Sequence, residues 1–124
     1  MTRQFRNIKA WRHAHEMTLK IYAATRLFPK EEKFGITSQL RRAGASIAAN
    51  IAEGSSRSSD ADYVRFLEIA TGSLRESEYF LLLAHDLGYL NLEAYSELND
   101  KLDETARTLF GLTASIRQQK LKQK

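Results

Sequence analysis

YSELNDKLDETARTLFGLTASI, residues 95–116, carries its core-type side chains at alternating steps of three and four residues. A seven-residue repeat of this kind puts one narrow stripe along an α-helix, and such a stripe packs against neighbouring helices. Asn91 can cap the helix, and Glu93 suits its first turn. The pattern predicts a buried stripe at Tyr95, Leu98, Leu102, Thr105, Leu109, Leu112 and Ile116.

Three further segments upstream show helical periodicity, and local signals mark their ends. Pro29 ends the first, because the residue before a proline is pushed out of helical geometry. Gly54 ends the second, where we expect glycine to take the left-handed conformation, and Gly88 ends the third. Ser59 can cap the start of the third, with Asp62 three residues later. The predicted helices therefore cover residues 7–28, 36–54, 59–88 and 91–120.

The connections between these helices are short, and short connections make neighbouring helices run in opposite directions. We therefore predict an all-α fold, an antiparallel up-and-down four-helix bundle that forms a single domain over residues 1–124. A chain of 124 residues can bury a core of this kind without disulfides or a metal.

Composition narrows the classes of function. The chain has no cysteine, which excludes disulfides and thiolate metal sites and favours a reducing, cytoplasmic setting. Residues 1–10 carry charges and no apolar core, so they do not read as a secretory signal. The longest apolar run, residues 79–84, is far shorter than the roughly 18–20 residues of a membrane span, and we expect no membrane partner.

Charge is unevenly distributed along the chain. Residues 1–30 hold seven Lys or Arg and one acid, residues 59–90 hold two Arg and six acids, and residues 117–124 add four cations. This pattern is typical of proteins that bind a polyanionic partner, or of proteins whose oppositely charged faces meet within an oligomer.

In an antiparallel bundle the start of the first helix and the end of the fourth lie at the same end, so two basic clusters would converge there. The candidate phosphate-binding residues for RNA or DNA are Arg3, Arg6, Lys9, Arg12, Arg41, Arg42, Arg117 and Lys120. The alternative is that these cations form an ordinary solvated surface. Few aromatic residues accompany them, so any binding should depend weakly on base sequence.

Small and surplus apolar residues suggest assembly of several copies. Gly44 and Gly72 lie inside predicted helices, where each costs about 1 kcal/mol relative to alanine. Such glycines are typical of close backbone approach, either within one subunit or between subunits. Phe80, Leu82 and Leu83 make the third helix apolar on nearly all sides, which favours a homo-oligomer.

One polar cluster lies where the second helix ends and the third begins. Asn50, Glu53 and Arg57 follow one another at helical steps, and Tyr63 and Arg65 come just after the connection. Glu53 and Arg57 form an i,i+4 pair in the favourable order. The cluster is either a network that fixes this corner of the fold or a recognition surface.

No arrangement of residues predicts catalysis. His13 and Glu16 share a helix face, but a di-metal bundle needs a Glu-x-x-His on two helices together with further carboxylates. We expect His15 at the edge of the core, and His85 near the end of the third helix, where a cation suits the helix dipole. No glycine-rich phosphate loop occurs. We predict that the protein is not an enzyme and holds no metal or cofactor.

An ordered set of residues matches a known family. The set comprises Phe5, Trp11, Tyr22, Phe28-Pro29, Gln39-Leu40-Arg41-Arg42-Ala43, Ser46-Ile47, Asn50-Ile51-Ala52-Glu53-Gly54, Arg57, Asp62-Tyr63, Arg65-Phe66-Leu67, Ile69-Ala70, Gly72-Ser73 and Glu76. Over about residues 5 to 115 the chain resembles the four-helix bundle proteins encoded in the intervening sequences of bacterial 23S ribosomal RNA genes.

The resemblance implies an antiparallel four-helix bundle assembled as a homopentamer. It also implies kinship with the accessory proteins of diversity-generating retroelements, which are basic pentameric barrels that bind nucleic acid and a reverse transcriptase. This chain differs from them in its acidic third helix and its small net charge of +4. The expected function is that of a non-enzymatic, homo-oligomeric accessory protein that binds RNA or another nucleic acid. The alternative is a structural or protein-interaction module with no nucleic-acid role.

Overall fold

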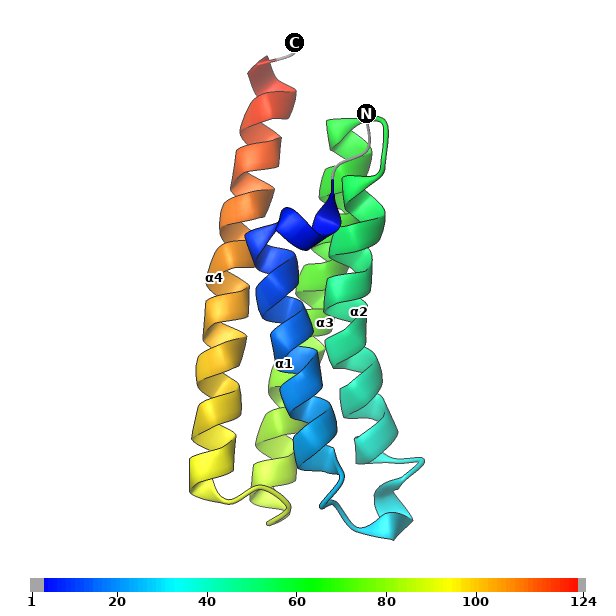
Figure 1. The fold of residues 1–124 in the computed structure, drawn as a ribbon, viewed down its shortest axis with the longest axis vertical. Coiled ribbons are helices and arrows are strands. Elements are labelled where there is room, and N and C mark those ends of the chain that lie inside the picture. Colours follow the sequence, from blue (N-terminus) through cyan, green and yellow to red (C-terminus); the bar gives the residue numbers. More distant parts are fainter. Residues whose placement is uncertain (1–3, 123–124) are drawn as a thin grey trace.

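The computed structural model describes the backbone of residues 4–122 and the side chains of residues 4–119. The described chain is helical and contains no strand. Two short 3-10 helices, η1 and η2, accompany the four long helices α1 to α4 (Figure 1). Their bounds are η1 Phe5–Asn7, α1 Lys9–Thr25, η2 Lys30–Glu32, α2 Ile36–Ser55, α3 Asp60–Asp86 and α4 Leu92–Lys122.

Each long helix packs against two others: α1 against α2 and α4, and α3 against α2 and α4. The four helices thus enclose one core, and the chain turns back on itself at each of the three connections between them (Figure 1). The prediction of an all-α bundle of four packed helices is confirmed. The expected assembly of several copies stays a prediction.

The local signals at the helix ends have mixed outcomes. Ser59 caps α3, because its Oγ accepts a hydrogen bond from the Asp62 backbone N–H at 3.1 Å. Asn91 Oδ1 accepts one from the Ala94 N–H at 2.8 Å at the start of α4. Gly88, with φ of 82°, takes the left-handed conformation after α3 as predicted. The expectation for Gly54 is wrong, because α2 continues to Ser55 and Gly54 keeps a negative φ.

The first helix is shorter than predicted. Residues 5–7 form η1, and α1 begins only at Lys9 because Ile8 has an extended backbone. At the other end, α1 stops at Thr25 and a turn follows, in which the Phe28 N–H donates to the Thr25 carbonyl at 3.1 Å. Phe28 is thereby turned into the core, where it is 6% exposed.

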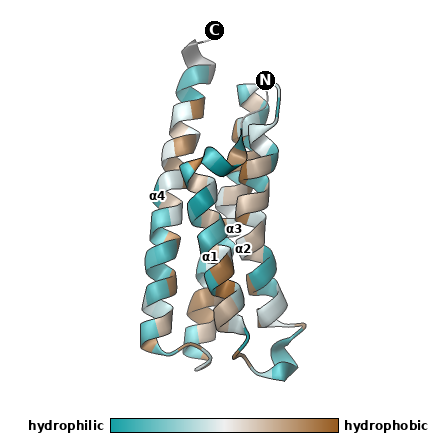
Figure 2. Cartoon of the chain, viewed as in Figure 1, coloured by the Kyte–Doolittle hydropathy of each residue, from teal (hydrophilic) through white to brown (hydrophobic). Residues whose placement is uncertain are grey.

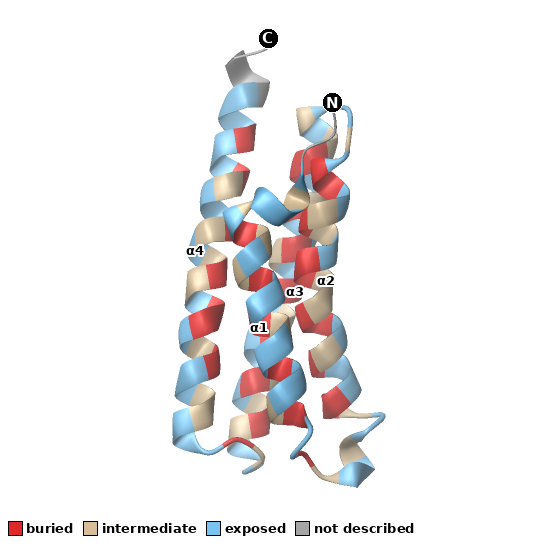
Figure 3. Cartoon of the chain, viewed as in Figure 1, coloured by how far each residue is buried: buried red, intermediate tan, exposed pale blue. Residues whose placement is uncertain are grey.

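The core follows the stripe predicted for residues 95–116, whereas α1 buries Ala10, Ala14, Met17, Ile21 and Thr25. Buried and exposed residues alternate along each long helix, as do hydrophobic and hydrophilic ones (Figures 2 and 3). Thr105 is fully buried, and its hydroxyl donates to the Lys101 carbonyl at 2.8 Å, so this polar position in the stripe is satisfied. The α4 stripe is buried at Leu98, Leu102, Thr105, Leu109 and Ile116 and partly buried at Tyr95 and Leu112.

The helix glycines divide into two kinds. A Cβ on Gly44 would lie 2.8 Å from Ile21 Cδ1, and one on Gly54 would lie 2.8 Å from Phe66 Cβ. These two glycines therefore permit close packing of α2 on α1 and on α3 within one chain. A Cβ on Gly72 or Gly111 would meet nothing within 4 Å. The fold of a single chain gives no reason for these two.

We expect Gly54→Ala to destabilise the fold by about 1–3 kcal/mol. The new methyl group would press on Phe66 Cβ, which cannot move unless α2 and α3 separate. Gly111→Ala is the matched control, because its Cβ meets open space and gains up to about 1 kcal/mol of helix propensity. Urea denaturation followed by circular dichroism measures both, and equal stability of the two variants would contradict the packing explanation.

Candidate nucleic-acid interface

The start of α1 presents an exposed basic surface. Arg6 lies in η1, and Lys9 and Arg12 lie in the first turns of α1, with all three side chains exposed. An aromatic contact holds η1 against the helix, since the Phe5 and Trp11 rings meet edge to face at 4.9 Å. We call Arg6, Lys9 and Arg12 the α1 basic surface.

The charges of this surface are not compensated by ion pairs. None of Arg6, Lys9 and Arg12 forms an ion pair with any residue that the structure describes. The Arg6 guanidinium lies 5.7 Å from the Phe5 ring centroid, and the charge of Arg12 contributes only a minor lowering of the pKa of Glu16. The surface can therefore accept an external anion without first breaking an internal ion pair.

The two α2 candidates are engaged within the bundle. Arg41 is half-buried, its Nε donates to Thr25 Oγ1 at 2.7 Å, and its guanidinium lies 4.6 Å from the Tyr22 ring centroid. Arg42 forms an ion pair with Glu76 of α3 and also donates to Gln39 Oε1. Arg42 thus has a compensated charge, whereas Arg41 keeps its charge beside an aromatic ring.

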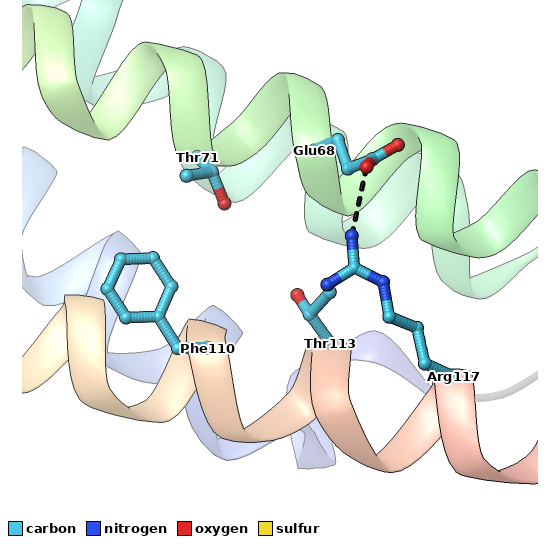
Figure 4. Close-up of a pocket in the computed structure, with 5 residues that line it drawn as sticks. All are labelled: Glu68, Thr71, Phe110, Thr113 and Arg117. Atoms are coloured by element: carbon cyan, nitrogen blue, oxygen red, sulfur yellow. Dashed lines mark hydrogen bonds and ion pairs between the residues drawn. The ribbon is translucent and has the colours of Figure 1, made fainter.

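Arg117 of α4 is likewise paired. Its Nη2 donates to Glu68 Oε2 of α3 at 2.9 Å, and Figure 4 shows the guanidinium reaching across to that carboxylate. The pair closes one end of a groove of about 340 Å³, which Thr71, Phe110 and Thr113 also line. Arg3 and the Lys120 side chain lie outside the described residues. Of the eight predicted phosphate-binding residues, the structure therefore brings together Arg6, Lys9 and Arg12 as unpaired cations.

The predicted polar cluster joins α2 to α3. Glu53 pairs with Arg57 at 2.7 Å, and Asp62 pairs with Arg65 at 3.0 Å and more loosely with Arg57 at 3.7 Å. Phe66 is in contact with both guanidinium groups, whose centres lie 4.5 and 4.6 Å from its ring centroid. Two carboxylates thus balance two guanidiniums, which favours the interpretation that this cluster fixes the corner of the fold.

Two other members of that cluster act separately. Asn50 Nδ2 donates to the Ser46 carbonyl at 2.8 Å and to Ser46 Oγ at 3.0 Å, and Ser46 Oγ also accepts from Ser73 of α3. Tyr63 is buried with 1% exposure and packs under Gly54. Asn50 therefore holds Ser46, which makes the contact with α3, and Tyr63 serves the core.

Sequence reasoning missed a buried lysine between α1 and α4. Lys101 is 9% exposed, and its Nζ donates to His13 Nδ1 at 2.9 Å and to Glu16 Oε1. Glu104 Oε2 lies 3.9 Å from the same His13 nitrogen. The hydrogen bond from Lys101, together with its charge, lowers the pKa of Glu16. His13 and Glu16 do share a face as predicted, and a lysine joins them.

The other two histidines stack on aromatic rings. His15 is exposed and lies parallel to Trp11 at 4.9 Å, so the expectation that it lies at the core edge is wrong. His85 Nδ1 lies 2.9 Å from the Leu90 carbonyl oxygen, and its ring stacks on Tyr95 at 4.4 Å. Within the described residues, no three His, Asp or Glu side chains are placed to hold a metal ion. No helix in residues 4–122 is long and apolar enough to cross a bilayer.

Comparison with known proteins assigns the chain to a protein family. The sequence model of the 23S rRNA-intervening sequence proteins matches residues 6–111. The chain belongs to this family. No curated protein matches the chain. The chain is also similar to the crystal structure of a Bacteroides thetaiotaomicron protein of unknown function from the S23 ribosomal protein family. The two structures align with a TM-score of 0.76 and 29% sequence identity, and the alignment covers 83% of this chain and 96% of the other.

The structure shows what several of the residues that match the family do in the fold. The Asn-Ile-Ala-Glu-Gly segment, residues 50–54, supplies the α2 side of the contact with α3. Asp62 and Phe66 supply the α3 side. In this member of the family, that motif has a clear role in packing the fold.

We expect the Lys101 contact to make stability depend on pH. The pKa of Glu16 is lowered in the folded state, so its contribution is present above its ordinary value of 4.5 and is lost as pH falls through the folded pKa. In Lys101→Met, the pKa of the Glu16 carboxyl measured by NMR should rise toward its ordinary value, because the hydrogen bond and charge that lower it are gone. Lys20→Met is the control, because it removes the exposed α1–α4 pair with Glu97 and leaves Glu16 with Lys101. An unchanged Glu16 titration in Lys101→Met would contradict this assignment.

Proposed function

We propose that this protein is a non-enzymatic, homo-oligomeric accessory protein of the cytoplasm that binds RNA or another nucleic acid. The observation that carries the proposal is the α1 basic surface, where Arg6, Lys9 and Arg12 are exposed and have no ion pair with a described residue. Arg42, Arg57, Arg65, Arg75 and Arg117 contrast with them, because each pairs with a carboxylate.

Unpaired cations on a rigid helix suit phosphate groups. Binding a phosphate to such a cation releases counterions from the nucleic acid, and that release supplies most of the affinity. Three contacts per subunit correspond to a slope of log K against log salt of about −2 to −3. Several copies in one assembly would multiply these contacts along one strand.

Assembly of copies is supported by the outer face of α3. Tyr79 is 56% exposed and Leu82 is 43% exposed, as is Ile69 on the preceding turns. Gly72 lies on the same helix and leaves room for the backbone of another chain. Phe80 and Leu83, which also suggested an oligomer, pack against the chain's own core. We propose that copies meet at this face of α3, with five subunits as the family resemblance implies.

A structural or protein-interaction module is the second candidate. It is favoured by the balanced charges around Phe66 and by the exposed apolar face of α3, because both features serve packing and assembly. A module of this kind would form the same oligomer and would be indifferent to nucleic acid.

A salt series separates the two candidates. We expect the wild-type protein to shift RNA in a mobility assay at low salt, and Arg6→Gln, Lys9→Gln and Arg12→Gln combined to remove most of the binding and flatten the salt slope by about 2 to 3. The control combines Lys20→Gln, Arg75→Gln and Arg117→Gln, which removes the same charge from paired sites. Equal loss in both triple variants, or no wild-type binding, counts against the proposed interface.

The oligomer is tested by a charge on the α3 face. We expect Leu82→Arg to lower the mass measured by light scattering while circular dichroism stays helical, because an arginine in an apolar contact is desolvated without a partner. Leu92→Arg is the control, since Leu92 is 71% exposed at the start of α4 and outside the face. A wild-type monomer, or dissociation by Leu92→Arg alone, would exclude assembly through α3.

A further inference from the structure

A second basic feature lies where α1 leads into α2, at the opposite end of α1 from the α1 basic surface. Here a groove of about 350 Å³ lies between the end of α1 and the start of α2. This volume falls within the roughly 300–1,000 Å³ of ordinary ligand pockets. Its lining includes Tyr22, Lys33, Phe34, Thr37, Arg41 and Arg42, and we call it the Phe34 groove.

Phe34 is exposed, and its ring does not contribute to the core of the bundle. Its side chain is 87% exposed, whereas Phe28, six residues earlier, is 6% exposed and packs on Tyr89 at 5.4 Å. Phe28 therefore serves the core of this connection, and Phe34 does not. A phenylalanine held in water on an ordered turn offers an open ring face to a ligand.

Arg41 and Tyr22, which also line the groove, form a rigid stack. Arg41 lies over Tyr22 at 4.6 Å, and the hydrogen bond from its Nε to Thr25 Oγ1 fixes the guanidinium plane. A planar guanidinium that is already stacked on a ring can stack on a nucleobase with its other face. The lining of the groove thus includes an exposed ring and a fixed cationic plane.

The charge of the groove is positive. Lys33, Arg41 and Arg42 line it, and none of the described residues that line it is a carboxylate. Glu76 pairs with Arg42 and balances its charge, so Lys33 and Arg41 carry the positive charge of the groove. Glu32 accepts a hydrogen bond from the Tyr89 hydroxyl at 2.8 Å and does not line the groove. Lys33 pairs with no described carboxylate, and its ammonium lies 5.5 Å from the Phe34 ring centroid. The complementary ligand is therefore anionic.

One buried hydroxyl in the lining lacks a partner. Thr37 is 7% exposed, and its Oγ1 has no hydrogen-bond partner among the described residues. Buried polar atoms in folded proteins are almost always satisfied, so an exception next to a groove is compatible with a ligand's polar edge completing it.

We propose that the Phe34 groove binds single-stranded nucleic acid, with one base on Phe34 and a neighbouring phosphate on Lys33, which has no carboxylate partner among the described residues. This inference rests on the proposed function and names the substrate class. Aromatic rings beside cations are the arrangement that holds unpaired bases. Duplex bases are stacked on one another and cannot reach the ring. A second copy fits less well, because a symmetric contact through this groove would bring Lys33, Arg41 and Arg42 against the same cations.

The test compares a single-stranded oligouridine of about 12 nucleotides with an RNA duplex of equal length, using fluorescence anisotropy. We expect Phe34→Ala to weaken binding of the single strand by roughly 5- to 150-fold, the effect of losing one stacked base, and to leave duplex binding unchanged. Phe34→Leu should lose as much, because it keeps apolar bulk and lacks the ring, and Phe34→Trp should retain binding. Leu27→Ala is the matched control, since Leu27 is also 87% exposed and does not line the groove.

The outcomes separate this inference from the proposed function. If the wild type binds the single strand and Phe34→Ala binds equally well, the groove is excluded and the α1 basic surface remains the interface. If Phe34→Leu keeps full affinity, the ring does not stack on a base and the inference is wrong. A fall in the mass of Phe34→Ala by light scattering would identify the groove as a contact between copies. If the wild type binds neither RNA, the proposed function fails together with the groove.

Discussion

The structure depends on one constraint: each of four helices must bury a narrow apolar stripe against two neighbours. Closure of the ring satisfies that constraint, and it fixes which side chains point outward. Close approach of α2 to α1 and α3 is possible because Gly44 and Gly54 leave room for Ile21 and Phe66. Everything available for recognition lies on the outer faces of the ring and on the connections between helices.

Charge pairing then sorts the outer surface into two kinds of region. Ion pairs between neighbouring helices tie α1 to α4 through Lys20, α2 to α3 through Arg42, and α3 to α4 through Arg117. Pairs of this exposed kind contribute little to stability, but they neutralise the cations that they involve. The cations at both ends of α1 have no such partner among the described residues. Both ends of this helix therefore carry cations whose charge no described ion pair neutralises.

Much of the fold could be predicted from sequence because its signals are local. The Ser59 cap, the Gly88 turn and the seven-residue repeat of α4 each involve residues close in the chain. Features that depend on distant residues could not be predicted. The sequence gives no sign that Lys101 is buried, yet it is 9% exposed and its ammonium donates hydrogen bonds to His13 and Glu16 across the contact of α1 with α4. Arg42 and Arg117 were predicted as candidate phosphate-binding residues, and only the packing of α3 reveals their carboxylate partners.

Because the helices differ in length, local opening should be easier at one end of the bundle than in its middle. With 17 residues, α1 is about 26 Å long, whereas the 31 residues of α4 extend about 46 Å. Beyond the start of α1, the three-residue η1 packs against α2 in place of a fourth helix (Figure 1). Detaching η1 disrupts far fewer contacts than melting a helix. Amide protons that η1 covers should therefore exchange with solvent through a local opening. Their exchange should be faster than that of amide protons in the part of the bundle where all four helices pack together.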